Sequence, residues 1–494
     1  MSVIILIGGK AGQGPNILAH ILAEIFASQG YYVFYSRDYQ SLIRGGHNFN
    51  VLTFSDEPVY SNDKIINVLI CLDENTKDLH LKELKKDGKV LEGNYPNMYF
   101  AGAAAKIFGL DFGILENKLK KLKDFEKNLE EAKKGYETEK GNVKLEKLKE
   151  KKFIFMNGNQ GISQGAIKSG LDIYYAYPMT PATSVLNELA GMQEKNNILV
   201  LELENEISVI NAAIGSSITG AKSMVGTSGG GFDLMTESLS LTGQAEIPLV
   251  VYLAQRPGPG TGIATYTAQG DLGIALNPGH GEFPKLVVAP GEPIEAEELT
   301  SQAFYFSQKY KIPTIILGDK HLGESFYAME KEPIITASEK STSLKKYSGN
   351  EIDERGVTSS KAEVVKKNFD RRLNKFREIE KEAEKFCEFK IYGNKKSKNL
   401  VVGWGSTKGA ILDAIKNVGC KFIQVLYLEP FPKKIKEELK KAEKIILVEN
   451  NSTGQLGKLI TEKTGIFIED KILKYDGRPF FCDELREEIR GKLR

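Results

Sequence analysis

Side chains that form disulfides or bind metals are scarce in this 494-residue sequence. The four cysteines, Cys71, Cys387, Cys420 and Cys482, stand far apart and include no CxxC pair, which excludes a disulfide framework and a motif for an iron–sulfur cluster. The five histidines are scattered, and no pair has the spacing of metal ligands. We therefore predict no metal site on this chain.

Charge of one sign and long apolar runs are lacking as well. The 67 basic residues nearly balance the 65 acidic ones, so the net charge of +2 creates no field that would attract nucleic acid. No apolar run approaches the roughly 20 residues that cross a bilayer. The first residues also lack the basic stretch and the longer apolar run of a signal peptide. We expect a cytoplasmic protein that binds neither nucleic acid nor membrane.

The composition is that of an ordinary globular protein, with 41% hydrophobic and 27% charged residues. The length suggests about three domains. We predict an α/β fold with domains at 1–115, 151–330 and 396–494. The stretches between them, 116–150 and 331–395, are strongly charged. We expect the first to be a solvated helix with a linker, and the second to be a helical connector.

Short apolar runs alternate with amphipathic stretches in each α/β domain, which predicts strands joined by helices. In the first domain this rhythm predicts a mostly parallel sheet. In the connector, a long helix is predicted at 362–386. The predicted strands are 3–7, 31–35, 65–72, 173–176, 198–201, 222–225, 249–253, 285–288, 314–317, 400–402, 422–425 and 445–448.

Four motifs in the second domain each follow a predicted strand, so we expect them to converge on the sheet edge where open α/β sheets bind ligands. The first is Tyr177-Pro178-Met179-Thr180-Pro181, which leads from a strand into a helix. The Thr180 hydroxyl can hold a carboxylate there. The alternative is a turn in which Thr180 caps the following helix.

Acidic side chains and glycines form the next two motifs. Glu202, Glu204 and Glu206 precede a helix rich in small residues, where a half-buried carboxyl can share a proton with a ring nitrogen. Alternatively, all three only interact favourably with the helix dipole. The segment Thr227-Ser228-Gly229-Gly230-Gly231-Phe232 is a loop whose glycines allow a ligand close to the backbone.

The fourth motif is Arg256-Pro257-Gly258-Pro259-Gly260-Thr261-Gly262, with Thr265 shortly after it. The Arg256 guanidinium can bind a carboxylate through two parallel hydrogen bonds, and the prolines stiffen its loop. The alternative is a structural turn with a surface ion pair.

Together the four motifs resemble the α subunit of 2-oxoacid:ferredoxin oxidoreductases, which shows YPITP, an acidic stretch before an AIG helix, TSGPGF and RxGPSTG in this order. This chain reads YPMTP, ENE, TSGGGF and RPGPGTG. The resemblance spans the whole chain as a fused γ–α arrangement. It identifies 1–115 as a γ-type domain, 151–330 as a thiamine-diphosphate pyrimidine-binding domain and 396–494 as similar to the transketolase C-terminal domain.

The resemblance implies roles for single residues. Thr180, Arg256 and Thr265 would bind the 2-oxoacid. Glu206, nine residues before Gly215, would activate the pyrimidine ring of thiamine diphosphate and is preferred over Glu204 and Glu202. The residues expected to line the cofactor are Tyr177, Pro178, Glu206, Thr227, Ser228 and Gly229.

The implied reaction is oxidative decarboxylation of a 2-oxoacid, 2-oxoglutarate above all, with coenzyme A, giving acyl-CoA and CO₂ and passing electrons to ferredoxin. The chain has Gly270-Asp271-Leu272-Gly273 but no GDG motif for the Mg²⁺ that anchors the diphosphate. Mg²⁺ and a [4Fe–4S] cluster are therefore expected on a separate β subunit, without which this chain would be inactive. Gly230 and Gly260 replace a proline and a serine of the family pattern, which leaves the substrate range open.

Several alternatives stay open. Pyruvate, indolepyruvate or branched-chain 2-oxoacids are alternative substrates, and a coenzyme-A- or nucleotide-binding regulatory module is the non-enzymatic alternative. The glycine-rich loop Gly8–Gly14 departs from the dinucleotide-binding spacing, so we interpret it as a structural turn or a coenzyme A contact. Arg44-Gly45-Gly46-His47 is either another such contact or a plain loop. We expect a packing role for the segment Asn450–Leu456, with helix capping or a coenzyme A contact as alternatives.

Overall fold

The computed structural model of the protein describes residues 2–40, 46–141, 145–149, 151–341 and 346–494. Within these ranges the strands form three sheets, and the chain divides into two compact units. The mixed α/β architecture agrees with the predicted fold class, while the five-segment division stays a prediction. None of the described helices has the length and apolar character that crossing a membrane requires. The first unit comprises Met1–Met156, Ser325–Glu332 and Phe481–Leu485, and the second comprises Asn157–Glu324, Pro333–Phe480 and Arg486–Arg494.

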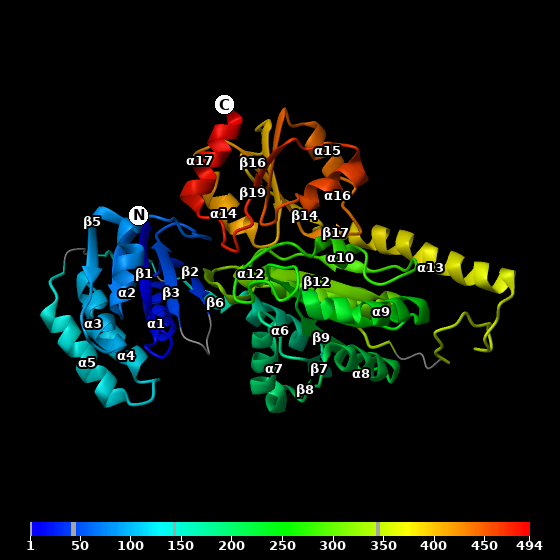
Figure 1. The fold of residues 1–494 in the computed structure, drawn as a ribbon, viewed down its shortest axis with the longest axis horizontal. Helices are drawn as coiled ribbons and strands as arrows, with labels where there is room; N and C mark the ends of the chain where they lie inside the picture. Colours follow the sequence, from blue (N-terminus) through cyan, green and yellow to red (C-terminus); the bar gives the residue numbers. More distant parts are fainter. Residues whose placement is uncertain (1, 41–45, 142–144, 150, 342–345) are drawn as a thin grey trace. The chain divides into compact units, whose positions relative to one another are not determined.

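The first unit is built on a sheet with the strand order β5-β4-β1-β3-β2-β13-β6. Figure 1 labels β5, β1, β3, β2 and β6 of this sheet. Its strands are β1 (Ser2–Lys10), β2 (Tyr32–Tyr39), β3 (His47–Ser55), β4 (Ile66–Cys71), β5 (Leu84–Leu91), β6 (Ile154–Asn157) and β13 (Phe326–Met329). Its helices are α1 (Pro15–Ser28), α2 (Glu74–His80), η1 (Leu81–Glu83), α3 (Asn97–Ile107), α4 (Phe112–Leu119) and α5 (Phe125–Thr138).

The sheet of the first unit is mixed, so the prediction of a mostly parallel sheet is wrong. β1 pairs with β4 in parallel, but β3 runs antiparallel to both β1 and β2. The connection from β2 to β3, residues 40–46, is shorter than the roughly dozen residues that a parallel crossover needs, so the chain turns back. Because β3 lies between β1 and β2, the β1–α1–β2 segment lacks the adjacent parallel strands of a dinucleotide-binding unit.

The second unit contains a sheet with the order β17-β11-β12-β10-β9-β7-β8. Its strands are β7 (Ile173–Ala176), β8 (Leu199–Glu202), β9 (Ser223–Thr227), β10 (Leu249–Gln255), β11 (Leu286–Val288), β12 (Pro313–Asp319) and β17 (Tyr427–Glu429). The associated helices are α6 (Gly158–Lys168), α7 (Thr183–Asn196), α8 (Glu206–Ile218), α9 (Gly229–Ala245), α10 (Leu272–Leu276), α11 (Pro293–Tyr310), α12 (Lys320–Glu324) and α13 (Ala362–Ala383).

The strands of this second sheet are parallel from β8 to β11, and only β17 pairs antiparallel among the described pairings. Helices cover both faces, so β10 is buried along its whole length. Its alternate side chains enter two cores: Leu249, Val251 and Leu253 face one, and Val250, Tyr252 and Ala254 face the other. A strand buried on both faces reads as a continuous apolar run, which is why the sequence predicts it well.

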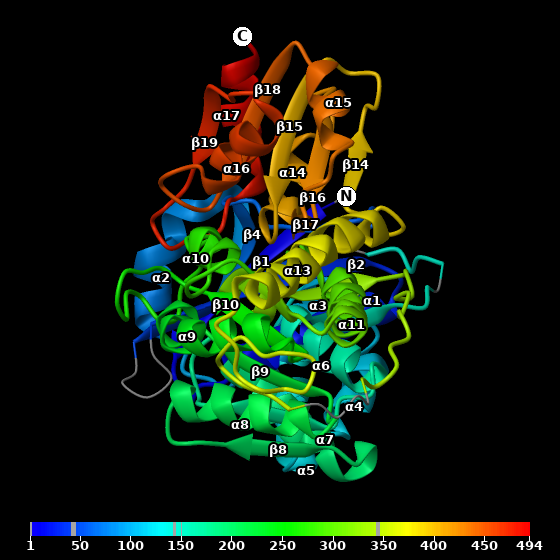
Figure 2. The ribbon, with the colours of Figure 1, turned by 90° about the vertical axis from the view of Figure 1, so that its right-hand side faces the viewer.

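The third sheet, also in the second unit, has the order β14-β16-β15-β18-β19, and Figure 2 shows its strands side by side. Its core is continuous with one face of the second sheet, because Trp404 and Ile423 belong to the same apolar cluster as Leu253. The elements are β14 (Phe389–Gly393), β15 (Asn399–Trp404), β16 (Lys421–Val425), β18 (Lys444–Glu449), β19 (Asp470–Leu473), α14 (Thr407–Ala414), α15 (Ile435–Lys440), α16 (Gln455–Thr464) and α17 (Cys482–Leu493).

A buried ion network also joins α11 to the third sheet. The Glu295 carboxylate, in a residue only 1% exposed, accepts hydrogen bonds from Lys390 Nζ at 2.7 Å, Lys408 Nζ at 2.8 Å and Gln424 Nε2 at 2.7 Å. Burial alone would raise the pKa of Glu295, but the two ammonium groups outweigh it and hold that pKa below its usual range. The network and the shared core hold the second and third sheets in one compact unit.

Replacing Lys408 by methionine should destabilise the second unit by about 3–5 kcal/mol, because it leaves the buried Glu295 without a main partner. Lys398→Met is the matched control, since its ion pair with Glu443 is exposed and such pairs contribute about 0–1 kcal/mol. Chemical denaturation of the two variants measures the difference. Equal midpoints for both variants would contradict a stabilising role of the buried network.

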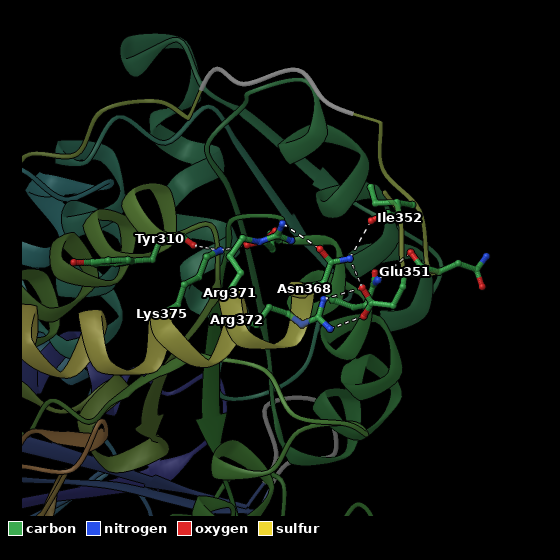
Figure 3. Close-up of polar contacts among 10 residues, drawn as sticks. Tyr310, Glu351, Ile352, Asn368, Arg371, Arg372 and Lys375 are labelled. Atoms are coloured by element: carbon green, nitrogen blue, oxygen red, sulfur yellow. Dashed lines mark hydrogen bonds and ion pairs between the residues drawn. The ribbon is translucent and has the colours of Figure 1, made fainter. Parts of the chain in front are cut away.

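The charged connector contains the long helix predicted at 362–386, observed as α13. Figure 3 shows Asn368 and Arg372 of this helix facing Glu351: Asn368 Nδ2 donates to Glu351 Oε2 at 2.8 Å, and the Arg372 guanidinium pairs with the same carboxylate. Lys375 Nζ donates to the Tyr310 carbonyl at 2.9 Å. Towards its end, Ile379 and Ala383 enter the core beside the second sheet. Because Glu351 belongs to the connector itself, the contacts of Asn368 and Arg372 join two parts of the connector. The contacts of Lys375, Ile379 and Ala383 attach α13 beside the second sheet.

Candidate active site

The carboxyl ends of β7, β8, β9 and β10 lie along one edge of the second sheet, because these strands are parallel neighbours. Tyr177 follows β7, Glu206 lies shortly after β8, Ser228 follows β9 and Arg256 follows β10. The expected convergence of the four motifs on one edge is thus confirmed. This edge is where open α/β sheets bind ligands.

Thr180 and Arg256 are in direct contact. Arg256 Nη1 donates to the Thr180 carbonyl at 2.8 Å, and Asn159 Nδ2 donates to the next carbonyl, that of Pro181, at 3.0 Å. Asn159 is itself held by the buried Tyr252 hydroxyl at 2.7 Å. Helix α7 begins with Ala182 as its N-cap and no side-chain cap, so Thr180 does not cap it. The half-buried Thr180 hydroxyl belongs to a turn that the sheet holds in place.

Glu206 is the first residue of α8 and is only 4% exposed, whereas Glu202 and Glu204 are exposed. The N-cap before it, Asn205, accepts a hydrogen bond from Ser208 N at 2.9 Å. The Glu206 side chain lies against the start of α9: a Cβ added to Gly231 would lie 2.6 Å from Glu206 Oε1. Of the three acidic candidates, Glu206 alone is buried, and its carboxyl packs on the start of α9.

Thr227 and Ser228 lead into the amino terminus of α9 and are fully buried. Ser228 is the N-cap residue of that helix, yet its Oγ finds no hydrogen-bond partner in the described part of the chain. The helix then starts with Gly229, Gly230 and Gly231. A buried hydroxyl without a partner and the first backbone N–H groups of a helix, which have no acceptor within the helix, together suit an anionic or heterocyclic group.

A cavity of about 560 Å³ opens beside this surface. Arg256 lies in its wall, half-buried, and burial lowers the pKa of its guanidinium while the nearby Asp271 opposes that change. The described residues that line the cavity are Gly229, Gly230, Asp233, Arg256, Pro257, Gly258, Pro259, Gly260, Ala268, Gly270, Asp271, Ile274, Asn450, Asn451, Ser452, Thr453, Gln455, Tyr475 and Gly477.

Asp271 is a titratable lining residue that sequence reasoning did not assign to the site. Burial raises the pKa of its carboxyl to about 6, Asp233 adds to this, and Arg256 opposes it. A Cβ added to Gly229 would lie 2.8 Å from Asp271 Oδ2, so the carboxyl packs on the start of α9. In the sequence, Gly270-Asp271-Leu272-Gly273 only departs from the GDG metal motif, and nothing local marks this aspartate as enclosed.

The segment Asn450–Leu456 lines the cavity besides having the predicted packing role. Asn450 N donates to Gln269 Oε1 at 2.9 Å, and Gln455 Nε2 donates to the Gly270 carbonyl at 2.7 Å. Glu449, which directly precedes the segment, is buried and accepts hydrogen bonds from Trp404 Nε1 at 2.9 Å and Leu456 N at 2.8 Å. The segment thus holds the loop that carries Asp271.

The other residues predicted for the site do not line the cavity. Thr265 is half-buried in the loop after Gly262, and Tyr177 and Pro178 are exposed. Among the described residues that line the cavity, the prediction included Arg256 and Gly229, whereas Thr180, Thr265 and Glu206 lie outside that lining.

The glycine-rich loop of the first unit, Gly8–Gly14, is held in place by the side chain of its own Gln13. Lys10 N donates to Gln13 Oε1 at 2.7 Å, and Gln13 Nε2 donates to the Leu72 carbonyl at 2.9 Å. These bonds agree with a structural turn. Of the Arg44–His47 motif, Arg44 and Gly45 lie outside the described residues, and His47 Nε2 lies 2.8 Å from His80 Nε2.

Comparisons with known proteins agree with the site. The model for the thiamine-diphosphate-binding domain of pyruvate flavodoxin/ferredoxin oxidoreductase matches residues 164–388, and the model for pyruvate ferredoxin/flavodoxin oxidoreductase matches residues 4–94. The fold is that of a 2-oxoglutarate:ferredoxin oxidoreductase from Magnetococcus marinus, solved with 2-oxoglutarate, coenzyme A and succinyl-CoA bound. That structure has a TM-score of 0.89 at 24% identity and covers 100% of both chains.

Two curated relatives bring the comparison to the level of family. The 2-oxoacid:ferredoxin oxidoreductase subunit alpha of Saccharolobus solfataricus is 29% identical, with 99% of this chain and 98% of the relative aligned. The 2-oxoglutarate synthase subunit KorA of Methanocaldococcus jannaschii is 31% identical, with 69% of this chain and 100% of the relative aligned. The chain therefore belongs to the 2-oxoacid:ferredoxin oxidoreductase family, as an alpha subunit.

Proposed function

We propose that this alpha subunit works with a separate β subunit to decarboxylate 2-oxoglutarate oxidatively, forming succinyl-CoA and CO₂ and reducing ferredoxin. The observation that carries the proposal is one sheet edge that brings together the enclosed Glu206 carboxyl, the buried Ser228 hydroxyl and the Arg256 guanidinium. The choice of 2-oxoglutarate is supported by the names of the KorA relatives and by the ligand bound in the Magnetococcus marinus enzyme.

The residues at the start of α9 fit the pyrimidine end of thiamine diphosphate. A Cβ added to Gly231 would lie 2.2 Å from Thr227 Oγ1 and would meet Glu206, so only glycine leaves the carboxyl and the helix start this close together. The buried Ser228 Oγ lacks a partner within the described ranges, as expected of a group that awaits a ligand. Thiamine diphosphate, when bound, supplies the electron sink that lets the bond to the leaving carboxylate break.

The chain's own residues then hold and position the reactants. The Glu206 carboxyl would share a proton with a ring nitrogen of the cofactor. This role needs a side chain that can both accept and donate a proton. Arg256 binds the 2-oxoacid carboxylate and, through its bond to the Thr180 carbonyl, keeps the Thr180 turn beside it. The remaining proposed contacts are Thr265 to the substrate, and Tyr177, Pro178, Thr227, Ser228 and Gly229 to the cofactor.

The Mg²⁺ that anchors the diphosphate, the [4Fe–4S] cluster and the ferredoxin contact are proposed to lie on the β subunit. The sequence supports this division, because it has neither a GDG motif nor a CxxC pair. Coenzyme A is proposed as the cosubstrate that takes up the acyl group. The active site would then form between two chains.

Purified alone, this chain should not reduce ferredoxin, whereas its complex with the β subunit should do so with 2-oxoglutarate and coenzyme A. We expect kcat/KM for 2-oxoglutarate to exceed that for pyruvate, indolepyruvate and branched-chain 2-oxoacids by at least about 10-fold, the discrimination that follows when substrates without a second carboxylate leave polar groups of the site unpaired. Omitting coenzyme A is the control. A preference for a monocarboxylate would reassign the substrate, and a complex that binds no thiamine diphosphate would support a regulatory module instead.

A further inference from the structure

Asp271 is an enclosed carboxyl that the proposed function leaves without a role. Its Oδ2 atom is buried and has no hydrogen-bond partner in the part of the chain that the structure describes. Both carboxyl oxygens lie close to the start of α9, 2.8 Å and 3.1 Å from the position of a Cβ on Gly229. Since a buried carboxylate oxygen without a partner is unfavourable, this environment favours the neutral, protonated carboxyl, in a residue that also lines the cavity.

The backbone around Asp271 is held rigidly. Asp271 N donates to Gln255 Oε1 at 3.0 Å, and Gln255 is itself buried at the end of β10. On either side, the Gly270 carbonyl accepts from Gln455 Nε2 at 2.7 Å and Gly273 N donates to Gln455 Oε1 at 3.1 Å. The carboxyl is therefore positioned before any ligand arrives, as a binding group must be if it is to act without reorganisation.

Few charged groups face Asp271. Arg256, after β10, is the cation of the cavity lining, and Asp233 of α9 is a second, exposed carboxylate there. The loop after β18 contributes only neutral side chains to the lining, and the segment after β19 contributes Tyr475 and Gly477. With both aspartates ionised, these groups carry a net charge of minus one. A site with that charge repels an anionic substrate unless it takes up a proton.

We propose that Asp271 takes up a proton when the 2-oxoacid binds, and in its neutral form donates a hydrogen bond to a substrate carboxylate held by Arg256. This inference rests on the proposed function and adds a substrate-binding residue to it. The bond that forms is Asp271 O–H to carboxylate oxygen, and the proton comes from solvent. An approaching carboxylate raises the affinity of the neighbouring carboxyl for a proton, so substrate and proton bind together.

The direction in which substrate affinity changes with pH follows from the pKa of Asp271 in the free site. Burial, with a contribution from Asp233, raises the pKa of Asp271 to about 6, and a bound anion raises that pKa further. Well below pH 6 the carboxyl is already neutral, so its protonation adds no pH dependence to the affinity. Above about pH 6, affinity should fall by up to about 10-fold per pH unit, because a proton must be taken up for each ligand bound.

The test is calorimetric titration of the complex of this chain and its β subunit with glutarate, a dicarboxylate that has no keto group to react. Titrations at pH 7 in buffers of different ionisation enthalpy count the protons taken up. We expect the wild type to take up close to one proton and its Kd to rise about 10-fold from pH 6.5 to 7.5. Asp271→Asn keeps a donor but cannot titrate, so it should take up none and have a pH-independent Kd.

Two further variants complete the design. Asp271→Ala removes the donor and should weaken glutarate binding at every pH. Asp370→Asn makes the same chemical change on an exposed residue of α13 that pairs with Lys366, and should behave as the wild type. Proton uptake that persists in Asp271→Asn would overturn the inference, and so would a wild type that takes up no proton. A complex that decarboxylates 2-oxoglutarate without uptake refutes only the role of Asp271, whereas one that neither reacts nor binds glutarate refutes the proposed function.

Discussion

Replacing Glu206 by glutamine should lower kcat for 2-oxoacid decarboxylation by about 10²–10⁴-fold, the range that a positioned acid or base contributes. Glutamine has nearly the shape of glutamate, so the contact with Gly231 at the start of α9 and the fold should persist. It cannot exchange a proton with a ring nitrogen, however, so the proposed activation of the cofactor fails. The direct measurement is the rate of hydrogen–deuterium exchange at C2 of bound thiamine diphosphate, which should fall in parallel with kcat.

Glu204→Gln is the matched control for this experiment. Glu204 stands two positions earlier in the same motif but is exposed, whereas Glu206 is only 4% exposed. We expect wild-type exchange and turnover from Glu204→Gln. If Glu206→Gln kept rapid exchange while Glu204→Gln lost it, the activating carboxyl would have been assigned to the wrong residue.

Replacing Arg256 by alanine should raise KM for 2-oxoacids by about 10–150-fold, since hydrogen bonds to charged groups contribute about 1.5–3 kcal/mol. The guanidinium is half-buried in the cavity wall, with Nη1 used by the Thr180 carbonyl. The other N–H groups of Arg256 are the ones proposed to hold the substrate carboxylate. Because Glu206 and Ser228 keep their places, the thiamine diphosphate content of the complex should change little. Steady-state kinetics together with cofactor analysis separate the two effects.

Arg355→Ala tests whether loss of any arginine has this effect. Arg355 is 82% exposed and pairs with Asp353 in the charged segment before α13. Its removal should leave KM unchanged. An unchanged KM in Arg256→Ala would exclude Arg256 from substrate binding, and loss of bound cofactor in that variant would instead indicate a structural role for the loop.

The inner strands of the second sheet, β7, β9, β10, β11 and β12, were predictable because burial on both faces leaves a local mark, whereas the edge strand β17 was not predicted. The run 173–176 matches β7, and the run 249–253 lies inside β10. Helix α13 was predictable as well, because its charged and apolar residues repeat with a helical period. β3 of the first unit went unpredicted, and with it the mixed character of that sheet. Strand direction depends on how short connections turn the chain back, and the apolar pattern of a strand is the same in both directions.

The candidate site, like the fold, was predictable from the sequence only in part. The order of the four motifs, each after an apolar run, was enough to predict that Thr180, Glu206, Ser228 and Arg256 share one sheet edge, because parallel strands end on the same side. The family resemblance already favoured Glu206 over Glu202 and Glu204, but only the tertiary structure showed that Glu206 is buried while the other two are exposed. Only the tertiary structure brought Asp271 beside Arg256. Burial and the proximity of charges arise from contacts between distant segments, such as 270–273 with Gln455, so no local pattern encodes them.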